Sequence, residues 1–103
     1  MLINHGANDR FSSAEAFRKG YRELLDAVTA HNRNSRIIVL SPFCGAHEDT
    51  LEKLVKEYNA HTGIGISFIR TTNWIPEAPL HPDRKGHREI SRRLAAELQE
   101  LGI

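Results

Sequence analysis

The run Ile37-Ile38-Val39-Leu40 restricts the possible folds of this chain more than any other segment. All four side chains are branched and apolar and three are β-branched, which predicts a strand that is covered on both faces. Strands of this kind are typical of parallel sheets, because helical crossovers cover both faces of such a sheet. Pro42 ends the strand, since it cannot donate a ladder hydrogen bond. The segment therefore predicts an α/β protein.

Apolar residues at helical spacing follow each predicted strand. Residues 1–5 and 64–69 are the other two predicted strands. The first helix is expected to begin at Ser12 with a capping box to Glu15, and the second at a capping box of Asp49 and Glu52. The second helix is expected to end before Gly63, and the third to begin near Asp83 or Arg84. The predicted stripes are Phe17, Tyr21, Leu24, Leu25 and Val28, then Leu51, Leu54, Val55 and Tyr58, then Ile90, Leu94, Leu98 and Leu101.

The resulting β-α-β-α-β-α order predicts a parallel sheet with right-handed crossovers and helical layers on its faces. At 103 residues the chain is expected to be one domain, spanning 1–103. Three strands make a thin sheet, and the strand at residues 1–5 leaves an open apolar edge. Such an edge favours pairing with another chain. We therefore expect either a homo-oligomer or a missing N-terminal half.

Composition excludes several partners. The net charge is +1, so no electrostatic argument favours nucleic acid or a membrane surface. No signal peptide and no run of ~20 apolar residues is visible, which predicts a cytoplasmic location. The single cysteine, Cys44, is interpreted as a small packing residue rather than a thiol nucleophile.

Ligands of open α/β sheets bind outside the carboxyl ends of the strands. Residues 6–10, 41–45 and 71–85 are all expected at that edge. Asn8 and His81 are therefore expected to face one cleft, although they are far apart in the sequence.

Two motifs lie in these segments. His5-Gly6-Ala7-Asn8-Asp9 resembles the Gly-x-Asn-Asp block of the SGNH (GDSL-type) esterases and lipases. Leu80-His81-Pro82-Asp83-Arg84-Lys85-Gly86-His87 resembles their closing block, and Ile38-Val39-Leu40-Ser41-Pro42 resembles the core strand between the two. The resemblance covers essentially the whole chain and is carried by the order and spacing of the blocks.

The resemblance implies an ester hydrolase with a flavodoxin-like sheet of about five strands, of which this chain would be the C-terminal half. Asn8 would donate its amide to the oxyanion, a contribution of ~3–4 kcal/mol to lowering the barrier. His81 would be the general base. Four further residues would support these two side chains: Gly6, Asp9, Asp83 and His87. The substrate would be a small acyl or acetyl ester, with a carbohydrate ester as one candidate, and no cofactor or metal is implied.

The sequence departs from the family pattern at two points. The acid that orients the base is expected three residues before His81, where Ala78 stands, and its loss can cost ~10⁴ in rate. Glu77 is the candidate substitute, with Asp83 as a second possibility. The Gly-Asp-Ser block that carries the nucleophile is absent, and no serine of the chain lies on a suitable strand-to-helix turn.

These departures leave two functional hypotheses. The chain is either a truncated hydrolase that needs a serine from elsewhere, or an inactive module that self-associates through its open sheet edge. A metal site of His81, Asp83 and His87 is a further alternative. Trp74 is expected either to line a cleft or to cover the edge of the core. His87 is expected to bond loop backbone, whereas four histidines are assigned to the surface or to loops outside any cluster: His5, His31, His47 and His61.

Overall fold

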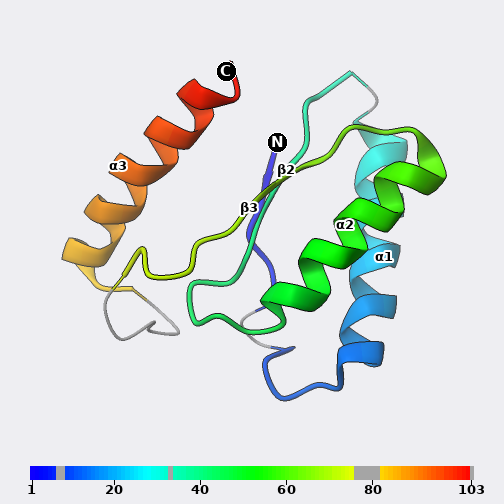
Figure 1. Ribbon diagram of the computed structural model, residues 1–103, viewed down its shortest axis with the longest axis horizontal. Helices are drawn as coiled ribbons and strands as arrows, with labels where there is room; N and C mark the ends of the chain where they lie inside the picture. Colours follow the sequence, from blue (N-terminus) through cyan, green and yellow to red (C-terminus); the bar gives the residue numbers. More distant parts are fainter. Residues whose placement is uncertain (7–8, 33, 76–81, 103) are drawn as a thin grey trace.

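A computed structural model describes residues 1–6, 9–32, 34–75 and 82–102 (Figure 1). Three strands alternate with three helices, which confirms the predicted α/β order. The elements are β1 (Leu2–Ile3), α1 (Ala14–His31), β2 (Ile38–Leu40), α2 (Glu48–Thr62), β3 (Ser67–Ile69) and α3 (Arg84–Glu100).

The three strands form an open parallel sheet in the order β1-β2-β3. Leu2 pairs with Ile38 and Ile3 with Val39, while Val39 pairs on its other side with Phe68. All three residues of β2 are buried, as predicted for the central strand of a parallel sheet. The outer side of β1 has no strand partner among the described residues, so the predicted open edge is present there.

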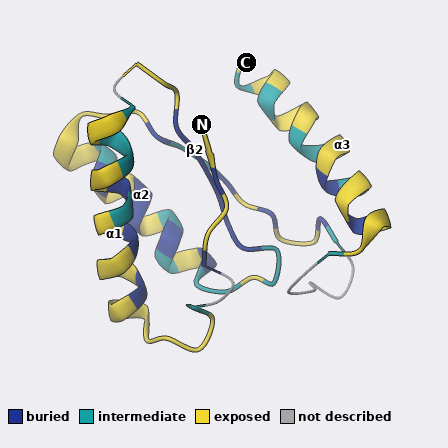
Figure 2. Ribbon diagram, turned by 180° about the vertical axis from the view of Figure 1, so that it is seen from behind, coloured by how far each residue is buried: buried dark blue, intermediate teal, exposed yellow. Residues whose placement is uncertain are grey.

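α1 and α2 cover one face of the sheet (Figures 1 and 2). Two right-handed crossovers that step in the same direction across a sheet place both helices on the same face. The predicted stripes point inward, because Phe17, Tyr21 and Leu25 of α1 and Leu51, Leu54, Val55 and Tyr58 of α2 are all buried. They join Ile3, Ile37, Val39 and Ile66 in the larger of the two hydrophobic clusters.

α3 covers the opposite face through a smaller cluster. Ile38, Leu40, Ile69 and Trp74 form its buried part. Leu94, Leu98 and Leu101 of α3 are only partly buried against it, and Ile90 is the one residue of the predicted α3 stripe that is classed as buried. Trp74 therefore covers the core, which decides between the two roles predicted for it.

The third strand is shorter than predicted, because it begins at Ser67 instead of residue 64. The Asn59 side chain captures the backbone of Ile66: its amide donates to the Ile66 carbonyl, and its carbonyl accepts from the Ile66 N–H, each at 2.9 Å. The backbone of Ile66 is therefore satisfied by α2 instead of by a sheet ladder.

The capping boxes predicted for the first two helices are wrong. Ser13, not Ser12, caps α1, with its hydroxyl accepting from the Ala16 N–H at 3.1 Å. The residue before α2 is His47, whose side chain does not cap the helix. Gly63 ends α2 in the left-handed conformation, as predicted. Asp83 caps α3, in agreement with the predicted start of that helix.

Candidate functional site

The carboxyl ends of the three strands meet at one edge of the sheet. The helix that follows each strand runs back along it, so the N-termini of α1, α2 and α3 also lie at this edge (Figure 1). Helix N-termini carry partial positive charge and unpaired N–H groups, which makes this edge favourable for an anion or a developing oxyanion.

A backbone hydrogen bond closes the turn after β1. The Asp9 N–H donates to the Gly6 carbonyl at 3.0 Å. Gly6 is buried with a φ of 128°, and a Cβ at this position would lie 3.0 Å from the Phe17 ring and 3.1 Å from Pro42. Only glycine therefore fits both the backbone conformation and the space. Gly6 and Asp9 thus lie at the predicted edge, whereas Asn8 falls outside the described residues.

His47 joins this turn to the loop that precedes α2. Its Nε2 lies 2.8 Å from the Asp9 carbonyl oxygen. Its ring stacks on that of Phe17, with centroids 4.2 Å apart and an angle of 13° between the planes. His5 adds a contact to the same residue, with Nε2 3.4 Å from Asp9 Oδ2.

His5 and His47 lie outside helices and strands, as predicted, but their contacts with Asp9 and Phe17 were not predicted. One signal in the sequence pointed to His47, namely its position just before a helix and within a few residues of the carboxyl end of β2. Its partner residues are distant in the sequence and could not be recognised from it.

The ends of β2 and β3 are joined by a buried pair of hydroxyl groups. Ser41 Oγ lies 2.9 Å from Thr71 Oγ1 and accepts from the Thr71 N–H at 2.8 Å. The Thr71 hydroxyl also bonds the Ser41 carbonyl at 3.0 Å. Ser41 is fully buried, so it is not accessible to a substrate.

The two acids predicted to form a capping box, Asp49 and Glu52, lie inside α2 and bind Arg70 instead. Its guanidinium binds Asp49 at 2.9 Å, binds Glu52, and lies 3.2 Å from the buried Glu48. Its hydrogen bond holds the pKa of Glu52 below the ordinary value. Thr72 donates to Glu48 as well. This network ties the end of β3 to the first turn of α2, so its groups act in packing and are already paired.

The predicted closing block is described only from Pro82 onward, and Glu77, Ala78 and His81 lie outside the described residues. Asp83 Oδ1 accepts from the Gly86 N–H at 2.7 Å. A Cβ on Gly86 would lie 3.0 Å from Pro82, so this glycine allows α3 to begin close to the preceding loop. The His87 side chain is exposed, and none of the hydrogen bonds among the described residues involves its ring. Most of the loop before α3 lies outside the described residues, so the backbone-bonding role expected for His87 stays a prediction.

No metal centre is visible in the described part of the chain, where no three His, Cys, Asp or Glu side chains are arranged around a common point. The metal alternative included His81, so it stays a prediction. Cys44 is a free, partly buried thiol in the loop after β2.

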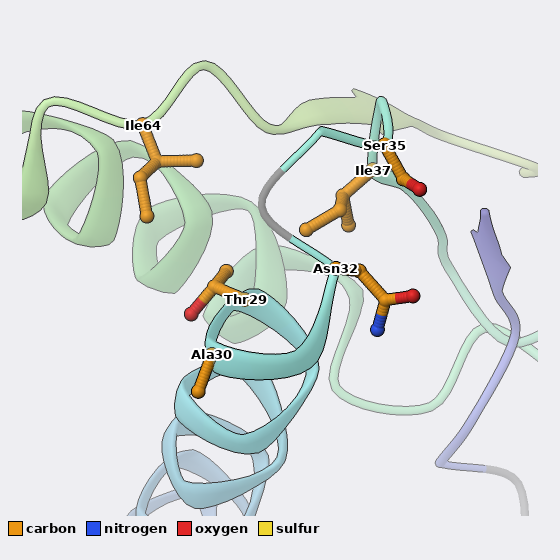
Figure 3. Close-up of a pocket in the computed structure, with 6 residues that line it drawn as sticks. All are labelled: Thr29, Ala30, Asn32, Ser35, Ile37 and Ile64. Atoms are coloured by element: carbon orange, nitrogen blue, oxygen red, sulfur yellow. The ribbon is translucent and has the colours of Figure 1, made fainter.

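A surface cavity of about 370 Å³ lies at the opposite edge of the sheet (Figure 3). It is bounded by the end of α1 and by the segment that joins α2 to β3. The described residues that line it carry no charge; they are Thr29, Ala30, Asn32, Ser35, Ile37 and Ile64.

Comparison of the chain with known protein families, with curated proteins and with solved structures finds no match. Among the described helices, none is both long enough and apolar enough to cross a membrane.

Proposed function

We infer that this chain is the C-terminal half of an SGNH-type ester hydrolase that acts on a small acyl or acetyl ester. The observation that carries the proposal is the Gly6–Asp9 turn. It follows β1 directly at the carboxyl edge of a parallel sheet, where the resemblance requires the Gly-x-Asn-Asp block.

The topology supports the proposal at the level of the fold. A flavodoxin-like sheet has the strand order 2-1-3-4-5, in which the last three strands follow one another in chain order. The order β1-β2-β3, with α1 and α2 on one face and α3 on the other, is compatible with those three strands. In the complete sheet, the strand order would reverse at the outer side of β1. Ligands of such sheets bind at that reversal, so the turn after β1 would border the site.

The chemistry would be acyl transfer to a serine that another segment or chain supplies. His81 would take the proton of that hydroxyl as its oxygen attacks the ester carbonyl carbon, and Asn8 would donate to the resulting oxyanion. His81 would then return the proton to the leaving alcohol. In a second step, water would attack the acyl-serine and release the acid. Asp83 already commits one carboxylate oxygen to Gly86, which favours Glu77 as the group that orients the imidazole.

Hydrolysis of p-nitrophenyl acetate tests the role of His81. Because the serine is missing, only slow turnover is expected, with His81 activating water directly. In His81→Ala the rate should fall to that of an equal concentration of free imidazole, whereas His61→Ala should keep the wild-type rate. His61 is the matched control, because it is an exposed histidine in the last turn of α2. Equal rates in the wild type and in both variants would refute catalysis by His81.

Self-association is the second candidate function, favoured by the outer side of β1. Met1 is 50% exposed and Leu2 is 46% exposed, beside a strand edge that has no partner among the described residues. Exposed apolar edges of this kind pair with other strands. Sedimentation over a range of protein concentrations should therefore detect a dimer or larger assembly. A clean monomer at every concentration would refute this function.

A further inference from the structure

The first half of α3 carries a concentration of positive charge that the composition of the whole chain conceals. Residues 84–93 contain five basic side chains and one acid, a net charge of +4, although the chain as a whole carries only +1. The rest of the chain is therefore acidic, with a net charge of −3. The expectation of no nucleic-acid partner was based on the average charge, which does not reflect this uneven distribution.

Four of these basic side chains lie on the exposed side of the helix, which faces away from the sheet (Figure 2). We call them the basic face; they are Arg84, Lys85, Arg88 and Arg92. Because residues four apart are neighbours on a helix surface, the three arginines form one line along the axis. At a rise of about 1.5 Å per residue, this line is ~12 Å long.

Most of the charge on this face is not neutralised by the protein. Glu89 binds Arg92 and also Arg93, which lies 2.8 Å away. The other three side chains of the basic face make no ion pair with any described residue. Arg70 on the opposite side of the molecule provides the contrast, since three acids surround it. The basic face is therefore available to an external anion.

The stability of α3 does not explain this arrangement. Like charges four residues apart, such as Arg84 and Arg88, repel each other and destabilise a helix. The first turn of α3 contains no acid, whereas α1 and α2 both have acids in that turn, where the helix dipole favours them. The side chains are exposed, so packing does not require them either. Binding of an anionic partner accounts for their presence.

We propose that the basic face binds the phosphate backbone of a nucleic acid. Three of its four side chains are arginines, whose planar guanidinium groups can each donate two parallel hydrogen bonds to a phosphate. Phosphates recur every ~3.4 Å along the axis for one strand of a DNA duplex. A line of ~12 Å therefore runs beside about three or four of them.

An anionic membrane is the alternative partner, and the structure disfavours it. Helices that bind a bilayer surface insert large apolar side chains between the lipids. The large apolar side chains that are exposed in the described part of the chain are Met1, Leu2, Phe11 and Ile64. None of them belongs to α3, so the basic face has no apolar residue beside it to insert.

Fluorescence anisotropy of a labelled short DNA duplex, titrated with the protein at several salt concentrations, tests the proposal. With about three or four phosphates neutralised, the logarithm of the association constant should fall with the logarithm of the salt concentration at a slope of about −3. In the double variant Arg84→Gln/Arg88→Gln, the slope should be about −1 and the affinity at low salt should fall about tenfold or more. Glutamine is a good helix former, so α3 should persist.

The matched control is Lys19→Gln/Lys53→Gln. It removes the same charge from exposed positions on α1 and α2, which cover the other face of the sheet. This variant should bind the duplex as the wild type does. An RNA duplex of the same length, titrated in parallel, identifies the source of the phosphates, because the tighter of the two complexes assigns the partner as DNA or RNA.

A third variant should strengthen binding. Glu89→Gln removes the acid that neutralises Arg92 and Arg93, so the slope should become more negative by about one and the affinity should rise. Circular dichroism of each variant checks that the helices are retained. A gain in affinity by a folded protein cannot result from misfolding, so this variant tests the proposal even if the double variant is unstable.

Three outcomes would overturn the proposal. The first is that the wild type binds neither duplex. The second is that Arg84→Gln/Arg88→Gln and Lys19→Gln/Lys53→Gln lose the same affinity, which would show an effect of net charge alone. The third is that vesicles containing phosphatidylserine bind the wild type whereas both duplexes do not, which would assign the basic face to a membrane.

Discussion

On the face covered by α1 and α2, side chains from both helices and from all three strands interlock in one cluster, whereas under α3 the buried residues come from β2, β3 and the segment that follows. The register makes the contrast sharper. Leu2 pairs with Ile38 and lies on the α3 face, where it is 46% exposed, while Ile3 pairs with Val39 and is buried beneath α1 and α2. The α1/α2 face thus forms a complete hydrophobic core, whereas on the opposite face α3 does not cover β1. The comparison indicates that stability resides mainly on one face and that the other has room for a neighbour.

Truncating one leucine on each face gives the largest expected effects. Leu51 on α2 is fully buried, and Leu51→Ala should lower the free energy of unfolding by ~3 kcal/mol, through lost burial and the cavity left behind. Leu98→Ala on α3 should cost ~1 kcal/mol, because this side chain is only partly buried. Urea unfolding measures both. Equal costs would contradict the difference between the two faces.

A pair of buried tyrosines tests whether the α1/α2 core is complete. The Tyr58 hydroxyl donates to Asp26 at 2.8 Å and lies 3.1 Å from that of Thr29, so Tyr58→Phe should cost ~1 kcal/mol. The Tyr21 hydroxyl is buried without a hydrogen-bond partner in the described part of the chain, and Tyr21→Phe should be neutral or stabilise by up to ~1 kcal/mol. Urea unfolding of the two variants measures both changes in stability. If Tyr21→Phe destabilises as much as Tyr58→Phe, the Tyr21 hydroxyl has a hydrogen-bond partner in this core.

Alkaline pH should act on the same core through Tyr21. Burial raises the pKa of the Tyr21 phenol above its ordinary value of 10.0. The folded state therefore holds this proton more tightly than the unfolded chain does. The stability from this group is fully present below about pH 10 and is lost as the pH rises further, because the unfolded chain ionises first. Between pH 9 and pH 11, Tyr21→Phe should lose less stability than the wild type. Parallel stability–pH curves would show that Tyr21 does not contribute.

The smallest effect on stability is expected at the uncovered strand. Leu2→Lys should change the free energy of unfolding by less than ~0.5 kcal/mol, because the side chain is largely exposed. It should nevertheless weaken self-association, since a charge on an edge strand opposes pairing with another strand. Sedimentation of Leu2→Lys beside Phe11→Lys, which alters another exposed apolar side chain, would separate an effect of the edge from one of general surface polarity. An assembly that survives Leu2→Lys would contradict association through β1.

The sequence predicted those parts of the fold that depend on local pattern. The run ending at Leu40 predicted a strand covered on both faces, and helical spacing predicted the buried residues of α1 and α2. The failures have long-range causes. Arg70 binds the acids that were expected to cap α2. Asn59 hydrogen-bonds the backbone of Ile66, which therefore does not join β3. Neither partner could be inferred from a local window.

The candidate site was predictable in outline and not in detail. The rule that ligands bind at the carboxyl ends of parallel strands correctly placed Gly6 and Asp9 at one edge. It could not find His47, because the contacts of that residue are with a stacking partner in α1 and a carbonyl oxygen in a different loop. Asn8, Glu77 and His81 lie outside the described residues, and their roles stay predictions.

The order of the strands bears on how the protein is made. Each strand pairs with the one before it in the chain, and none has to insert between two strands that are already paired. Synthesis at the ribosome releases the chain in this same order, so each new strand can dock on the edge left by its predecessor. Moderate sequence separation between paired strands also keeps the entropic cost of each closure low. Among the described residues, the larger cluster contains none beyond Phe68, so a nascent chain can complete it before α3 has emerged.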